Sequence, residues 1–225
     1  MLTTTTTTTI QKTEIQTPST RTPDSRLGDV QTTTLSFANM HNHGELFANI
    51  FRARKQSFID LKKWPLPEVD GMEFDQYDTP MSRWVAIHEN GRVLAGVRLT
   101  PTTARCGVYS YMIRDAQENL LNGTIPQNLL DGPAPVEETT WEASRLFIDH
   151  SIPAGRRMRV QMSLISEMSN SARELGASRL ICLVKATWPR WLTPRGVDAQ
   201  AMGPVIWIDD DYFQCVSINL APKMH

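Results

Sequence analysis

The chain has 225 residues, of which 40% are hydrophobic, and this is enough apolar material for one compact domain with a sizeable core. Its formal net charge of -1 excludes an overall basic field of the kind that attracts nucleic acid. The three cysteines are far apart and form no CxxC pair, which argues against a disulfide framework or a metal site.

No signal-peptide pattern is present at the N-terminus, and no apolar run approaches the ~20 residues of a membrane span. We therefore expect a cytoplasmic protein with no stable membrane association and no nucleic-acid partner. The first 35 residues differ from the rest, because a run of threonines at residues 3–9 leads into a segment rich in Thr, Ser, Pro and charge. Such a segment has little to bury, so we expect a disordered tail at residues 1–35 and a single domain at residues 36–225. Since threonine also favours β-structure, ordering against a partner is the alternative.

The first expected helix covers residues 45–62, where apolar residues recur with helical spacing. It places Arg54 and Phe58 on one face, because they are four residues apart. The Trp-Pro-Leu-Pro run that starts at Trp64 ends this helix, since a residue before proline avoids the α-helical region.

A polar loop with Asp75 and Asp78 is expected at residues 70–80. Two strand-like runs follow at residues 83–88 and 93–100, and the Glu-Asn-Gly-Arg turn between them predicts an antiparallel hairpin.

The second half of the chain is predicted to begin with a helix at residues 109–121, a strand at residues 140–148 and a long helix at residues 157–175. A central strand at residues 180–184, a short helix at residues 188–195 and two final strands at residues 205–208 and 212–220 follow. The long helix is the clearest of these, because its apolar residues stay in phase and Gly176 stops it. This order of elements favours a mixed sheet packed against helices.

A set of charged and aromatic residues runs through the middle of the chain. The set comprises Arg54, Phe58, Trp64, Asp75, Asp78, Arg98, Glu142 and Arg145. Apart from Trp64, these residues lie in the segments RARKQSF, DQYD, GVRLTPT and WEASR. In order and spacing this set resembles the LuxI-type acyl-homoserine-lactone synthases, over residues 46–220. The resemblance implies an α/β (α+β) fold, the N-acetyltransferase-like three-layer sandwich, in which a mixed central sheet is flanked by helices and an acyl thioester lies where two neighbouring strands splay apart.

The resemblance also implies the reaction. These acyltransferases join an acyl chain from acyl carrier protein, or from acyl-CoA, to the α-amine of S-adenosylmethionine. The substrate carboxylate then closes the lactone and releases methylthioadenosine, and the product is a quorum-sensing autoinducer. Such an enzyme needs no metal and no cofactor, because S-adenosylmethionine is a substrate.

Four charged residues form the expected catalytic group: Asp75, Asp78, Arg98 and Glu142. The resemblance places them in one electrostatic cluster that shapes the adenosylmethionine site. Glu142 is the best candidate for a general base, directly or through a water, provided that its pKa is raised from its ordinary ~4.3. The alternative is a buried ion-pair network that only holds the loop of residues 70–80 against the sheet.

The expected substrate-binding residues are Arg54, Phe58, Trp64, Ser144, Arg145, Leu146 and Phe147. The rings of Phe58 and Trp64 suit adenine stacking and a sulfonium cation, although core packing explains them too. Arg54 suits a carboxylate, either the substrate's or that of Asp75 or Asp78. Arg145 follows Glu142 by three residues, so both serve one cleft only if the strand carries a bulge.

Two features depart from the family pattern. Leu146 and Phe147 follow WEASR where the family usually has phenylalanine directly, so we expect an altered acyl pocket. The bulky run from Trp188 to Trp191 either shortens the acyl tunnel or caps the core.

Two other functions stay open. One is a sensor that binds adenosylmethionine or an acyl carrier without catalysis, and retention of the whole charged set argues against it. The other is an N-acetyltransferase that uses acetyl-CoA. Such enzymes usually carry a Q/R-x-x-G-x-G/A turn before the long helix, whereas residues 152–159 contain only Gly155.

Overall fold

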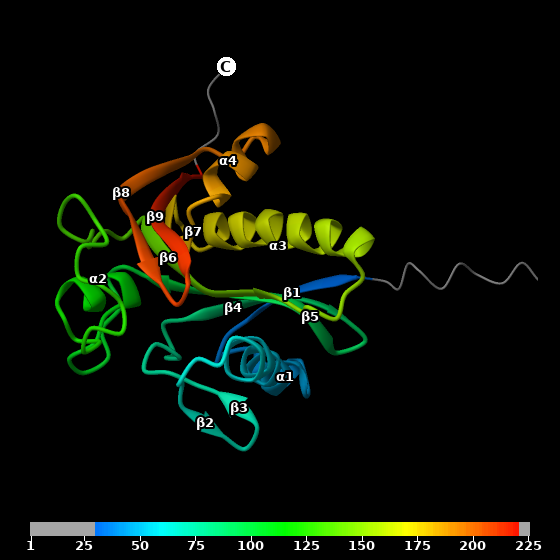
Figure 1. Ribbon diagram of the computed structural model, residues 1–225. Coiled ribbons are helices and arrows are strands. Elements are labelled where there is room, and N and C mark those ends of the chain that lie inside the picture. The colour runs from blue at the N-terminus through cyan, green and yellow to red at the C-terminus, as the bar shows by residue number, and fades with distance from the viewer. Residues whose placement is uncertain (1–29, 221–225) are drawn as a thin grey trace, which may run out of the picture.

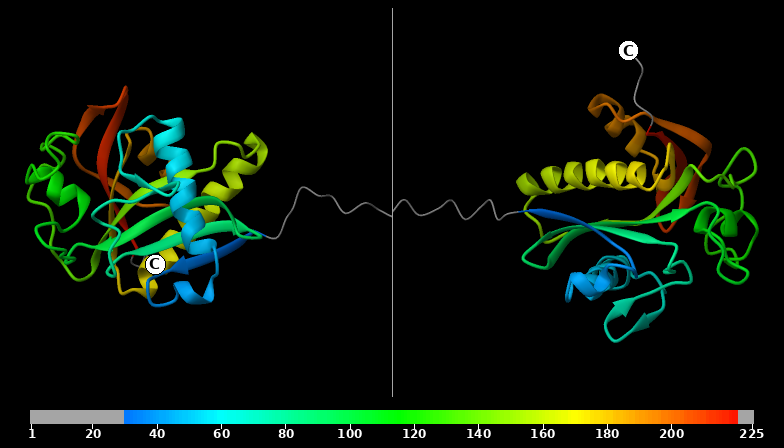
Figure 2. Two further views of the ribbon diagram at one scale, coloured as in Figure 1. Left: turned by 90° about the horizontal axis from the view of Figure 1, so that it is seen from below. Right: turned by 180° about the vertical axis from the view of Figure 1, so that it is seen from behind.

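The computed structural model describes residues 30–220 (Figure 1). A seven-stranded sheet in the order β1-β4-β5-β6-β7-β9-β8 forms the centre, and a separate two-stranded sheet pairs β2 with β3. Helix α3 lies along one face of the large sheet and α1 along the other, and the further views in Figure 2 agree. This is the predicted three-layer sandwich with a mixed central sheet.

The strands are β1 (Gln31–Leu35), β2 (Glu68–Val69), β3 (Met72–Glu73), β4 (Arg83–Glu89), β5 (Arg92–Pro101), β6 (Thr140–Ile148), β7 (Arg179–Lys185), β8 (Ala199–Ile208) and β9 (Asp211–Asn219). The helices are α1 (Leu46–Arg54), α2 (Met112–Gln117), α3 (Ala154–Glu174) and α4 (Trp188–Leu192). A π-helical segment, Lys55–Leu61, continues α1, and short 3-10 turns occur at Met40–Asn42 and Thr193–Arg195. In this described part of the chain, no helix is long and apolar enough to cross a membrane.

Most predicted elements are confirmed. Strand β6 has the predicted bounds, and β4 and β5 form the predicted antiparallel hairpin, whose Asn90 and Gly91 both have positive φ. The helix predicted at residues 109–121 is shorter, because only α2 is helical there.

The expected loop at residues 70–80 is wrong at its start, because β2 and β3 form a small hairpin around Asp70 and Gly71. Both turn residues have positive φ, the backbone that an Asp-Gly turn supplies.

The expectation of disorder as far as residue 35 is also wrong for its last five residues. Strand β1 pairs antiparallel with β4 from Gln31 to Leu35 at one edge of the sheet. Leu35 is fully buried, and the Thr34 hydroxyl lies 2.6 Å from that of Ser171 on α3. Three consecutive threonines therefore act as β-formers once a partner strand is available. Residues 1–29 lie outside the described part of the chain.

The two faces of the sheet carry separate parts of the core. Strand β4 is buried on both sides, and its side chains alternate between them. Val85 and Ile87 pack in the cluster that includes α3, whereas Trp84 and Ala86 pack with α1. Because both faces are apolar, each helix has a surface on which to bury its own apolar stripe.

One pair of neighbouring strands separates along its length. Strands β6 and β7 run parallel and are paired only from Thr140 to Glu142 on β6 and from Arg179 to Ile181 on β7. Beyond that point β6 continues to Ile148 beside β5, and β7 continues to Lys185 beside β9. The separation opens the sheet near its centre, as predicted for this fold.

Candidate active site

A cavity of about 680 Å³ occupies the opening between β6 and β7. Residues 143–146 of β6 and residues 182–185 of β7 line it. Its apolar lining comes from α3, α4 and β9 as well, through Met168, Trp188, Phe213 and Ile218. Its polar and aromatic lining includes Phe58, Lys62, Trp64, Asp75, Tyr77 and Arg145. One cavity therefore offers room for an apolar chain and contacts for a charged group.

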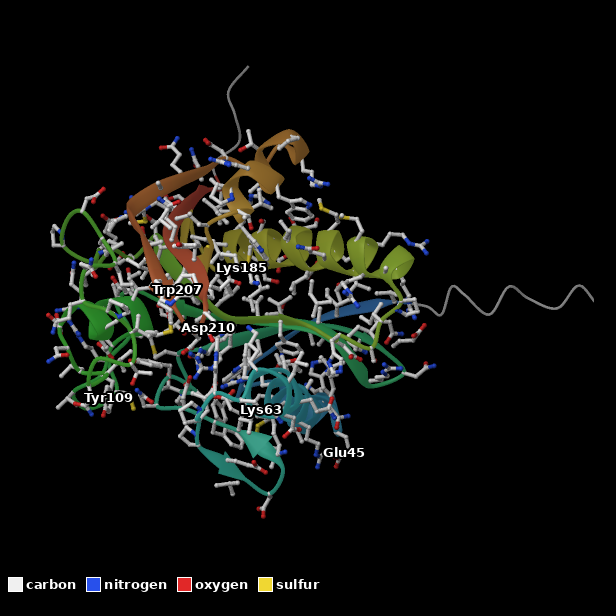
Figure 3. All side chains as sticks on the ribbon, viewed as in Figure 1. Glu45, Lys63, Tyr109, Lys185, Trp207 and Asp210 are labelled. Carbon is white, nitrogen blue, oxygen red and sulfur yellow. The ribbon has the colours of Figure 1, made fainter. Side chains whose placement is uncertain are left out.

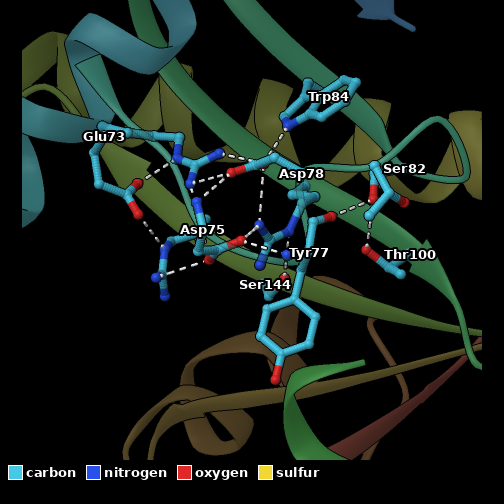
Figure 4. A network of polar contacts seen from close by, with 12 residues as sticks. Glu73, Asp75, Tyr77, Asp78, Ser82, Trp84, Thr100 and Ser144 are labelled. Carbon is cyan, nitrogen blue, oxygen red and sulfur yellow. Dashed lines mark hydrogen bonds and ion pairs between the residues drawn. The ribbon is translucent and has the colours of Figure 1, made fainter. Parts of the chain in front are cut away.

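Arg54 is buried and forms ion pairs with Glu73 and Asp78. Figure 4 shows this network of polar contacts, with the carboxylates of Glu73, Asp75 and Asp78 labelled. The Arg54 Nε donates to Glu73 Oε2 at 2.6 Å, and its two terminal nitrogens donate to the two oxygens of Asp78 at 2.7 and 3.0 Å. The planar guanidinium matches the carboxylate as a fork, which fixes both side chains. The sequence left open whether Arg54 binds substrate or pairs with aspartate, and the structure shows the aspartate pairing.

Two further arginines complete the network. Arg98 donates through Nη1 to Asp75 and to Asp78, the latter at 3.1 Å. The Arg145 Nη2 lies 2.8 Å from Asp75 Oδ2 in an ion pair, and its Nε donates to Glu73 Oε1 at 3.2 Å. Three arginines therefore face three carboxylates, Asp75, Asp78 and Glu73, so the network is balanced in charge.

The network favours the charged forms of Asp75 and Arg54. Burial acts to raise the pKa of Asp75, but Arg98, Arg145 and Arg54 together lower it well below its usual range. Burial likewise acts to lower the pKa of Arg54, but Asp78 and Glu73 outweigh it and raise that pKa. Of these six residues, only Asp75 and Arg145 also line the cavity. The other four hold these two in place.

A bulge in β6 directs Arg145 toward the network. Arg98 on β5 pairs with Ser144, but Gly96 pairs with Phe147, so β6 has one extra residue between these positions. Arg145 sits there with φ 52, a left-handed backbone that is uncommon for arginine. The bulge that was a condition for Glu142 and Arg145 to serve one cleft is thus present, but it brings Arg145 to the cavity beside Ser144, whereas Glu142 does not line the cavity.

The bulge also explains the Leu-Phe pair. Leu146 lines the cavity, whereas Phe147 turns to the other face and packs edge-on against Phe58 at 6.0 Å. A Cβ on Gly96 would lie 2.8 Å from the Phe147 ring, so glycine is needed at that position of β5.

Glu142 stands apart from the ion-pair network. It has no exposed surface, and its two oxygens accept from the backbone amides of Ile113 at 2.8 Å and Met112 at 3.3 Å, at the start of α2. Burial raises its pKa, although these amides and the charge of Arg98 act in the opposite direction. Glu142 does not line the cavity, but Ser144 does, and the Ser144 Oγ accepts from Arg98 Nε at 3.2 Å.

The rings of Phe58 and Trp64 are stacked, with centroids 5.3 Å apart and an interplanar angle of 9°. The Lys62 ammonium lies over both rings, 4.9 Å from the centroid of Phe58 and 4.4 Å from that of Trp64. Burial lowers the Lys62 pKa, and the charges of Lys185 and Arg145 add to this. Because these two rings already hold the Lys62 ammonium, they have the chemistry to hold the cationic group of a ligand.

Residues from distant elements meet at the same place. Lys62, Lys185 and Asp209 all line the cavity, although they come from the end of the π-helical segment, the end of β7 and the β8–β9 turn. In the view of Figure 3, Lys185, Asp210 and Lys63, which neighbours Lys62 in sequence, follow one another from top to bottom.

Sequence reasoning missed Glu73 and Lys62. Glu73 is fully buried between Arg54 and Arg145, and the available signal was its position two residues before Asp75, since such residues share one face of an extended segment. Lys62 follows Phe58 by four residues in a helix, the spacing at which side chains meet.

Residues 38–205 match a protein-family model with the description "Autoinducer synthase". An acyl-homoserine-lactone synthase of Pseudomonas chlororaphis is 28% identical over 185 residues, which cover 80% of this chain and 84% of that protein. One from Acinetobacter baumannii is also 28% identical, over 191 residues that cover 80% of this chain and 95% of that protein. Among solved structures, the acyl-homoserine-lactone synthase LasI superposes with a TM-score of 0.68 at 20% identity, covering 87% of this chain and 92% of LasI. These structural likenesses concern the fold.

Proposed function

Because the chain belongs to the autoinducer synthase family, we propose that the cavity between β6 and β7 is the active site of an acyl-homoserine-lactone synthase. The enzyme transfers an acyl chain from a thioester to S-adenosylmethionine. The observation that carries this proposal is a single cavity that combines an apolar lining with the charged side chains of Asp75 and Arg145.

The reaction has two bond-forming steps. The deprotonated α-amine attacks the thioester carbonyl, so that a C–N bond forms, the C–S bond breaks, and the thiol leaves with a proton. A carboxylate oxygen of the acylated product then attacks the γ-carbon of its methionine part. The bond from that carbon to the sulfonium breaks, its electron pair stays on sulfur, and methylthioadenosine leaves as a neutral thioether.

Two charged residues are proposed to contact S-adenosylmethionine directly. Arg145 suits the substrate carboxylate, because a guanidinium binds a carboxylate as a fork. Asp75 suits the ammonium or the sulfonium, since a partly desolvated carboxylate attracts a cation strongly. Arg54, Asp78 and Arg98 act as positioning residues, because their contacts are with the network rather than the cavity.

Glu142 is the proposed general base. A carboxylate whose pKa is raised by burial accepts a proton more readily than an exposed one. Its oxygens are held by the α2 amides behind the cavity wall, so the proton reaches it through an intervening group or a water rather than by direct contact. Phe58 and Trp64 are proposed to hold the adenosine and sulfonium part.

The apolar lining accommodates the acyl chain. Leu146, Met168, Val184, Trp188 and Ile218 surround this part of the cavity. Either an acyl carrier protein or coenzyme A presents the chain, because both carry it on the same phosphopantetheine thiol.

Three further expectations belong to this proposal. The reaction takes place in the cytoplasm, in keeping with three free cysteines, Cys106, Cys182 and Cys215. It needs no cofactor, because each reacting atom belongs to a substrate. Removing residues 1–29 leaves turnover intact, because their composition is poor in apolar side chains.

The test uses the purified full chain with S-adenosylmethionine and a panel of acyl-carrier and coenzyme A thioesters. Release of methylthioadenosine together with an acyl-homoserine lactone, identified by mass spectrometry, is expected with at least one donor. Consumption of acetyl-CoA without methylthioadenosine would instead indicate an N-acetyltransferase. Binding of S-adenosylmethionine by folded protein without turnover of any donor would indicate a sensor.

A further inference from the structure

Tyr77 ends in a hydroxyl group that has no hydrogen-bond partner among residues 30–220. The residue is 3% exposed, yet it lines the cavity. Leaving a buried polar group unpaired lowers stability, so a natural protein rarely keeps one without use. Figure 4 shows the Tyr77 ring extending away from the ion pairs, with the hydroxyl at its far end.

The rest of Tyr77 is firmly held. Its backbone N–H donates to Asp75 Oδ1 at 2.9 Å, and its carbonyl accepts from the Ser82 hydroxyl at 2.6 Å. The Arg98 guanidinium lies 5.4 Å from the ring centroid, and the Tyr109 ring meets it edge-on at 6.3 Å. The side chain is therefore held at the wall of the cavity by a rigid frame that includes the ion-pair network.

Charged groups from three elements surround this phenol. Arg98 on β5 lies over the ring, while Asp115 on α2 and Glu142 on β6 are the carboxylates that act on the hydroxyl. Burial raises the Tyr77 pKa, and these two carboxylates raise it further, so the phenol stays protonated. A protonated phenol is able to donate its O–H to a carboxylate and still keeps an oxygen lone pair for a donor in the cavity.

Glu142 needs such a connection. Its oxygens face the amides of Met112 and Ile113, and it does not line the cavity. Asp115 is also fully buried, and its oxygens accept from the backbone N–H and the hydroxyl of Ser110. Within residues 30–220, Tyr77 lines the cavity, and both buried carboxylates act together with burial to raise the pKa of its hydroxyl.

We propose that Tyr77 is a further catalytic residue, a relay through which the substrate ammonium loses its proton to the buried carboxylates. The ammonium N–H donates to the Tyr77 oxygen. As the proton passes to that oxygen, the phenol gives its own proton to the buried carboxylates, Asp115 and Glu142. Glu142 is the final acceptor. The tyrosine ends the step neutral, and the amine is left with the free electron pair that attacks the thioester.

The inference rests on the proposed function, and Tyr77→Phe tests it while keeping the ring and its contact with Arg98. We expect the rate of amide formation to fall about 10²-fold at pH values where the substrate amine is protonated. The defect should shrink as the pH rises above the amine's pKa, which is ~7.7–8.0 for an α-amino group, because the free amine needs no relay. The KM for S-adenosylmethionine should change little, and the melting temperature should stay equal or rise, because an unpaired hydroxyl has been removed.

Tyr111→Phe is the matched control. Tyr111 is also buried, and Glu142 raises its pKa as well, but its hydroxyl already donates to the Pro135 carbonyl at 2.6 Å and it does not line the cavity. This variant should lose stability and keep the wild-type pH profile. Wild-type activity with an unchanged pH profile in Tyr77→Phe would overturn the relay alone. Absence of methylthioadenosine release from the wild-type chain would overturn the proposed function itself.

Discussion

Arg54 and Asp78 are joined by two nearly parallel hydrogen bonds, from Nη1 to Oδ1 at 2.7 Å and from Nη2 to Oδ2 at 3.0 Å. Asp78 also accepts from the Trp84 indole at 3.1 Å and from Arg98 at 3.1 Å. One carboxylate therefore connects the last residue of α1 with the sheet strands β4 and β5. The polar frame of the cavity depends on this connection.

Asp78→Asn should destabilise the fold strongly. The change keeps the size of the side chain but removes a charge that faces two buried guanidinium groups. Breaking a buried ion pair from one side costs about 3–5 kcal/mol. Urea unfolding measures the loss, and Glu45→Gln is the control, because the exposed Glu45–Arg52 pair is worth about 0–1 kcal/mol. Equal unfolding midpoints for Asp78→Asn and wild type would refute this role of the network.

Asp75 should make the fold sensitive to acid. Its pKa is lower in the folded state than in the unfolded state, where it is ~3.9. Its contribution to stability is thus present above about pH 4 and is lost as the pH falls through the lower, folded-state value. The unfolding free energy, measured between pH 7 and pH 3, should decline at the acid end, and Asp75→Asn should reduce that decline. If the unfolding free energy of Asp75→Asn declines with falling pH as steeply as that of wild type, other carboxylates cause the sensitivity to acid.

Glu142→Gln should impair chemistry more than binding. Glutamine keeps the size and one accepting oxygen but takes up no proton, and loss of a general base typically costs about 10²–10⁴-fold in rate. Because no arginine among residues 30–220 forms an ion pair with Glu142, the loss of stability should be smaller than for Asp78→Asn. Single-turnover amide formation and the Kd for S-adenosylmethionine separate the two effects. Near-normal turnover with a large fall in Tm would make Glu142 a structural support for α2.

Trp188→Ala should shift the preferred acyl chain to greater length. Trp188 lines the cavity, and each additional buried CH₂ is worth about 0.8 kcal/mol, or roughly fourfold in kcat/KM. The adjacent Trp191 does not line the cavity, so Trp191→Ala is the control and should leave chain preference unchanged. Competition between donors of different length measures the shift. If Trp188→Ala and Trp191→Ala prefer acyl chains of the same length, Trp188 does not belong to the acyl site.

Local patterns were enough to predict much of the fold. The strand predicted at residues 140–148 is β6 with its observed bounds, and the Asn-Gly turn predicted the β4–β5 hairpin. Both depend on backbone preferences and on periodicities that act over a few residues. The resemblance to a known family, carried by residues such as Arg54, Asp75, Asp78 and Arg98, identified a group that the fold brings together.

Tertiary structure decided what each member of that group touches. Glu73 became the partner of Arg54 and Arg145, and Glu142 was turned to the α2 amides, away from the arginines. Strand β1 formed because β4, some fifty residues later, provided an edge for its threonines. Such pairings join residues that are distant in sequence, and their energies depend on burial and geometry. Sequence by itself determined the family, the order of elements and the charged set, whereas packing alone decided which charges balance one another and which of them face the cavity.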